Sequence, residues 1–145
     1  MAISADGRRL YLAMGPSGLR VVDTESNKVS TLRTEGYPMG LALTPDGRVL
    51  YVNYQNGGPG GSWGHDAIGR FDASTGVFLG STTGLPHVGQ TIAVSPDGSQ
   101  VWANGTDACY RPQYDHRGCP FVPGGIINVI GTNSHKLIQI GRAHV

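Results

Sequence analysis

Apolar residues in this chain fall in short consecutive runs, and a polar turn interrupts each run. Three stretches share this pattern: residues 1–12 (MAISADGRRLYL), 41–52 (LALTPDGRVLYV) and 92–103 (IAVSPDGSQVWA). In each stretch, an apolar–Ala–apolar–Ser/Thr run precedes an Asp-Gly pair, and an aliphatic and an aromatic residue stand four and five positions after the aspartate. Because these spacings are retained in three copies, the chain contains an internal repeat.

The Asp-Gly pairs predict tight hairpin turns. In Ser/Thr-Pro-Asp-Gly, proline presets the backbone of the second turn position, the aspartate bonds to nearby backbone, and glycine supplies a positive φ. The first copy carries Ala5 in place of proline, which a type I turn tolerates. Since the motif recurs in every copy, we assign a structural role to its residues, which are Asp6, Gly7, Asp46, Gly47, Asp97 and Gly98.

A second strand–turn–strand unit follows each hairpin, at residues 21–29, 70–78 and 129–137. Each copy therefore holds four short strands. Consecutive apolar residues imply sheets that are covered on both faces, and the recurrent alanine allows the inner strands to approach closely. The sequence predicts an all-β fold: a β-propeller fragment of about three four-stranded antiparallel blades. We place blade 1 at about 1–40, blade 2 at about 41–91 and blade 3 at about 92–139.

The repeat resembles the YVTN-type β-propeller repeat. The resemblance is carried by LTPDGRVLYVNY, in which Tyr51-Val52-Asn53-Tyr54 approximates the eponymous tetrapeptide, and by VVDTESNKV at residues 21–29. It implies a ring of about seven blades, export from the cytoplasm and a role in binding. The pattern is also similar to that of lactonase-type and quinoprotein propellers, so it indicates the fold more specifically than the function.

Both ends of the sequence suggest a fragment. Met1 aligns with the core positions Leu41 and Ile92, and three blades are fewer than the four or more that a ring needs. The tail IGRAHV (140–145) can be encoded by codons that match a short-read sequencing adapter, so we expect it to be an artefact of a metagenomic library. The alternative is a genuine terminal strand with a basic tip. We expect the outer blades to expose apolar faces and the isolated chain to be prone to aggregation.

Composition narrows the function classes. Eleven basic and ten acidic residues give a net charge of +1, which offers no electrostatic reason for binding nucleic acid or an anionic membrane. No apolar run reaches the length of a membrane span. The 23 glycines among 145 residues suit a turn-dense all-β chain.

Insertions between the second and third strands predict a candidate face. The spacing from the repeat's aromatic residue to the second turn grows from 12 to 21 and then to 29 residues along the three copies. In an antiparallel blade these loops lie at the same end as the connections between blades, and long loops on a rigid scaffold commonly carry function. The candidate ligand or partner residues on this face are Trp63, His65, Asp66, His87, Tyr110, Tyr114, Asp115 and His116.

Several interpretations of these loops remain open. The ordinary interpretation is that these are polar loops exposed to solvent, with their aromatic rings folded over the tops of the blades. The functional one is a surface for a protein, peptide or carbohydrate. A metal or acid–base site is the weakest, because sequence neighbours such as His65-Asp66 do not by themselves give ligand geometry. Cys109 and Cys119, the only cysteines, suit a disulfide that closes a small loop in an oxidising compartment, although two reduced thiols are an alternative.

The leading hypothesis is a non-catalytic binding or interaction scaffold in the periplasm or outside the cell. We expect no catalytic residues, no metal site and no cofactor in this portion. A lactonase-like or quinoprotein-like enzyme with its site at the channel mouth is the runner-up, and a repeat module of a larger surface protein is the third possibility. The expected inner-strand starts, Met1, Leu41 and Ile92, are apolar and followed by alanine, which disfavours a charged central site.

Overall fold

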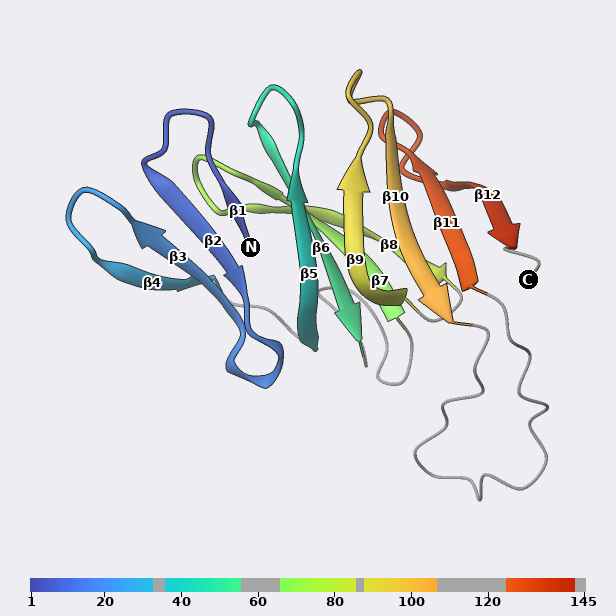
Figure 1. Cartoon of the computed structure of the whole chain (residues 1–145), viewed down its shortest axis with the longest axis horizontal. Helices are drawn as coiled ribbons and strands as arrows, with labels where there is room; N and C mark the ends of the chain where they lie inside the picture. Colours follow the sequence, from blue (N-terminus) through green and yellow to red (C-terminus); the bar gives the residue numbers. More distant parts are fainter. Residues whose placement is uncertain (33–35, 56–65, 86–87, 107–124, 143–145) are drawn as a thin grey trace.

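The computed structural model describes residues 1–32, 36–55, 66–85, 88–106 and 125–142. These residues form three four-stranded antiparallel sheets in which every strand pairs with its neighbour in sequence (Figure 1). This architecture confirms the predicted all-β class and is consistent with propeller blades. We refer to the sheets as blades 1, 2 and 3.

The strands of the blades have the following bounds. Blade 1 contains β1 (Ala2–Ile3), β2 (Arg9–Ala13), β3 (Leu19–Asp23) and β4 (Val29–Leu32), with the short 3-10 helix η1 (Gly15–Ser17) between β2 and β3. Blade 2 contains β5 (Tyr37–Leu43), β6 (Val49–Gln55), β7 (Asp66–Asp72) and β8 (Phe78–Leu85). Blade 3 contains β9 (Val88–Val94), β10 (Gln100–Thr106), β11 (Gly125–Gly131) and β12 (Leu137–Arg142).

Two inner strands begin earlier than the repeat alignment predicted. β5 starts at Tyr37 and β9 at Val88, ahead of the expected starts at Leu41 and Ile92. A register shift between Pro38 and Gly40 lets the early part of β5 continue pairing with β6. At the C-terminal end of the chain, β12 includes the first residues of the 140–145 tail.

Blade 2 is covered on both faces, which explains its consecutive apolar residues. Neighbouring side chains on β6 point to opposite faces of the sheet, so Leu50 packs toward blade 1 while Tyr51 packs toward blade 3. The core between blades 1 and 2 consists of Tyr11, Leu19, Leu41, Leu50, Val52, Tyr54, Phe71 and Ala73. The core between blades 2 and 3 consists of Tyr51, Ile68, Leu85, Val88, Ile92, Val101, Ala103 and Ile130.

The inner strands of blades 2 and 3 approach closely because Gly40 has no side chain. A Cβ atom at this position would lie 2.0 Å from the backbone oxygen of Gln90 on β9. Glycine is therefore required by the contact between the two blades.

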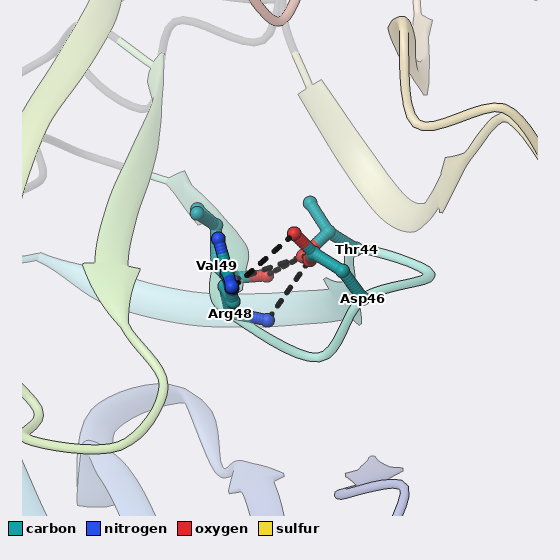
Figure 2. A network of polar contacts seen from close by, with 4 residues as sticks. All are labelled: Thr44, Asp46, Arg48 and Val49. Atoms are coloured by element: carbon teal, nitrogen blue, oxygen red, sulfur yellow. Dashed lines mark hydrogen bonds and ion pairs between the residues drawn. The ribbon is translucent and has the colours of Figure 1, made fainter.

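The turn between β5 and β6 is closed by the side chain of Asp46. Its Oδ1 accepts a hydrogen bond from the Thr44 hydroxyl at 2.5 Å and one from the backbone N–H of Arg48 at 3.0 Å (Figure 2). The Thr44 hydroxyl in turn accepts from the backbone N–H of Val49 at 3.0 Å. Asp6 and Asp97 make the corresponding bonds in blades 1 and 3, and Gly7, Gly47 and Gly98 all have φ near +70°.

Among the described residues, none of the helical segments could span a lipid bilayer.

Candidate functional site

The strand ends that flank the insertions lie at one end of the molecule, which we call the loop end. β6 stops at Gln55 and β7 starts at Asp66 at this end, where η1 also lies (Figure 1). Of the predicted face residues, only Asp66 belongs to the described part of the chain. The other seven, Trp63, His65, His87, Tyr110, Tyr114, Asp115 and His116, lie outside it. Cys109 and Cys119 also lie outside it, so the disulfide stays a prediction.

Asp66 holds two blades together. Its side chain is buried, and its Oδ2 accepts a hydrogen bond from the backbone N–H of Val88 at 2.8 Å. The neighbouring Gln55 donates from Nε2 to the Val88 carbonyl at 3.3 Å. The carboxylate of Asp66 therefore positions the start of β9 at the loop end.

Asn53, on β6 like Gln55, makes further contacts to the backbone of β9. Its amide Nδ2 lies 3.2 Å from the Gly89 carbonyl and 3.3 Å from the Thr91 carbonyl, and the side chain is fully buried. A buried amide that donates to backbone carbonyls of the next blade fixes the relative placement of the two sheets. At the loop end, the start of β9 is thus held to β6 and β7 by side-chain hydrogen bonds to its backbone.

The opposite end, which we call the turn end, carries the turn aspartates. Hydrogen bonds from the Ser95 hydroxyl, the Ser99 backbone N–H and the Ser99 hydroxyl lower the pKa of Asp97 to about 2. Bonds from the Ser74 hydroxyl and from Thr75 likewise lower the pKa of Asp72 to about 2. The ionised carboxylates of Asp72 and Asp97 thus accept hydrogen bonds within their own turns and stabilise them. No group of three or more His, Cys, Asp or Glu among the described residues could hold a metal ion.

A cleft lies between blades 2 and 3 at the turn end, and the sequence analysis does not predict it. It has a volume of about 640 Å³, and its lining includes Tyr51, Arg70, Asp97, Thr132 and His135. The Nε atom of Arg70 is buried and has no hydrogen-bond partner among the described residues. Burial raises the pKa of Tyr51, and burial together with the charge of Arg70 lowers the pKa of His135. We call this feature the turn-end cleft.

A signal for the cleft is present in the repeat. Two residues before the second-turn position, blades 1 and 3 carry Val21 and Val129, whereas blade 2 carries Arg70. Val21 and Arg70 lie on the face that is turned toward the next blade, and Val129 lies on the corresponding outer face of blade 3, opposite Trp102. A charged residue at a position that is otherwise apolar marks a departure from the structural repeat.

Three stacked four-stranded antiparallel sheets with the same turn chemistry define the class of protein as an all-β chain built from propeller-type blades. No protein-family model matches the sequence, and a search of curated proteins finds no match. Among solved structures, the hydrazine synthase of Kuenenia stuttgartiensis is similar, with a TM-score of 0.73 and 19% identity. The alignment covers 98% of this chain and 36% of that one. The chain thus spans little more than a third of its structural relative, and at this identity the likeness shows the fold alone.

Proposed function

We propose that this chain belongs to a YVTN-type β-propeller that serves as an exported, non-catalytic binding scaffold. Its ligand is a protein, a peptide or a carbohydrate, bound at the loop end. The bracing of β9 by Asn53, Gln55 and Asp66 carries this proposal, because it makes the edge that bears the insertions rigid. A rigid edge lowers the entropy cost of presenting loop side chains to a partner.

The composition of the insertions supports the choice of ligand. Segments 56–65 and 107–124 carry tryptophan, tyrosine and histidine beside aspartate. Aromatic rings next to hydrogen-bonding groups suit sugar faces and peptide side chains, and such residues dominate the energetics of binding surfaces.

Binding can be tested by probing the full chain against carbohydrate and peptide arrays. We expect a subset of ligands to be retained, with binding lost in Trp63→Ala and Tyr114→Ala. The matched control is Arg48→Ala, at an exposed position of the turn end, which should bind as the unmodified chain does. An array without any bound ligand, or equal binding by all variants, would contradict the proposal.

Export can be tested separately through the cysteines. If the protein resides in the periplasm or outside the cell, Cys109 and Cys119 should form a disulfide in material purified without reductant. Mass spectrometry after alkylation should then find no free thiol. Two alkylated cysteines in periplasmically expressed protein would count against an oxidising compartment as its natural location.

A further inference from the structure

The turn-end cleft differs from the interface between blades 1 and 2, where side chains occupy the equivalent position. There, the Tyr11 hydroxyl donates a hydrogen bond to the Ala73 carbonyl at 2.6 Å. The Arg9 guanidinium donates to the same carbonyl at 2.9 Å and also to the Ser74 carbonyl. Long side chains from blade 1 therefore occupy this position and satisfy the backbone of blade 2.

The interface between blades 2 and 3 replaces these groups. Counting from the turn aspartate, Val49 stands where blade 1 has Arg9, and Tyr51 stands where it has Tyr11. The shorter Val49 does not fill the space, and it lines the cleft of about 640 Å³. The Tyr51 hydroxyl makes no hydrogen bond to any described residue, whereas its counterpart in blade 1 does. A donor is thus left facing the cleft.

Arg70 brings a positive charge to the same cleft. Gly80 on β8 makes room for it, because a Cβ atom there would lie 2.6 Å from Nη2 of Arg70. In the described part of the chain the only ion pair joins Arg48 to Asp46, so Arg70 has no carboxylate within pairing distance. The Nε atom is enclosed by protein, but the Nη atoms donate no hydrogen bond to any described residue, so they are the donors that an acceptor in the cleft would meet.

We propose that the turn-end cleft binds a small monocarboxylate, whose oxygens accept hydrogen bonds from Arg70 and Tyr51. The planar fork of a guanidinium matches the geometry of a carboxylate, and a phenol adds a third donor. Asp46 and Asp97 also line the cleft, and their turn hydrogen bonds keep them ionised. The two aspartates repel every anion, and they repel phosphate and polycarboxylates more strongly than a monocarboxylate, whose single charge the Arg70 guanidinium offsets.

This site is independent of the loop end. Its lining residues lie on the turns and on β6, β7, β8 and the β11–β12 connection, at the end of the blades opposite the insertions. The chain can therefore bind a macromolecular partner and a small carboxylate at the same time, and each site can fail experimentally without the other.

The test uses acetate as the probe. In NMR spectra at constant ionic strength, acetate titrated against chloride should shift the backbone amides of Gly98 and Thr132, which line the cleft, in a saturable manner. Phosphate should bind more weakly than acetate. Non-saturable shifts that chloride reproduces, or tighter binding of phosphate, would overturn the proposal.

Matched variants separate binding from folding. Arg70→Met should abolish the saturable shifts at Gly98 and Thr132, and Arg48→Met, also at the turn end, should retain them. Tyr51→Phe removes one hydroxyl that bonds to no described residue, so it should keep the fold and weaken acetate binding about fivefold. Tyr11→Phe is its control and should leave acetate affinity unchanged. Equal affinities in Tyr51→Phe and the unmodified chain would show that the phenol is not part of the site.

Discussion

The Tyr11 hydroxyl and the Ala73 carbonyl, 2.6 Å apart, join blade 1 to blade 2 in the buried interface. The corresponding tyrosine of blade 2, Tyr51, makes no such bond to the part of the chain that the structure describes. We therefore expect Tyr11→Phe to lower the free energy of unfolding by about 1 kcal/mol, the usual net value of one intramolecular hydrogen bond. Tyr51→Phe should change it by much less. Urea titration with an unchanged m-value measures both, and equal losses would contradict the assignment.

Close approach of the inner strands gives a second prediction. In Gly40→Ala, the new methyl group would meet the backbone oxygen of Gln90 at 2.0 Å, and neither strand can yield without breaking pairs in its own sheet. We expect a loss of at least about 3 kcal/mol in the free energy of unfolding. Thermal and urea unfolding followed by circular dichroism would measure it.

The control for this substitution is Gly125→Ala at the start of β11. No atom lies within 4 Å of a Cβ atom built at this glycine, so the added methyl group meets no obstacle. The stability of Gly125→Ala should remain close to that of the unmodified chain. A Gly40→Ala protein as stable as this control would show that the strands can separate at little cost.

The turn aspartates predict a specific pH dependence. The pKa of Asp97 is lowered from 3.8 to about 2 in the folded chain, so the folded state binds its proton less readily than the unfolded state does. The resulting stabilisation is fully present above about pH 4 and is lost as the pH falls through about 2. Asp97→Asn should therefore be less stable at pH 6 and lose less stability between pH 4 and pH 2.

Urea midpoints measured across this pH range would check the effect. The control is Glu25→Gln, because the Glu25 carboxylate accepts no hydrogen bond in the described ranges. An Asp97→Asn profile parallel to that of the unmodified chain would show that the turn bonds do not depend on the charge.

The sequence predicts features that repeat and misses features that arise where two different blades meet. Asp46 and its counterparts stand at fixed spacings, and the physics of a tight turn is local, so the strands and turns follow from the pattern. Gly40 and Arg70 differ between copies, and their roles depend on which atoms of the next blade face them. The first copy begins at Met1, so it offers no residues for comparison with the early parts of β5 and β9.

The arrangement of the loop residues also could not be predicted from the sequence. Sequence spacing places an insertion at one end of a blade, but it does not determine how side chains within that insertion converge. Its neighbours in sequence group Asp66 with the candidate ligands. The structure shows that it accepts a hydrogen bond from Val88, a contact that depends on how blade 3 docks on blade 2.

The outer face of blade 3 gives the last prediction. Trp102 is 43% exposed, whereas the residues at the same repeat position in blades 1 and 2, Tyr11 and Tyr51, are 2% and 3% exposed. Ile127 on the adjacent strand is 49% exposed, and its cross-strand partner is Asn104, on the same face as Trp102. These residues form an apolar surface of the kind that the other blades bury against a neighbour.

We therefore expect the chain to associate in a concentration-dependent manner through this surface. The double variant Trp102→Thr and Ile127→Thr should shift sedimentation velocity profiles toward monomer while changing the stability of the monomer by less than about 1 kcal/mol. Val77→Thr, at a 59% exposed position of the β7–β8 turn, is the control and should associate as the unmodified chain does. A chain that remains monomeric at high concentration would show that this face needs no partner.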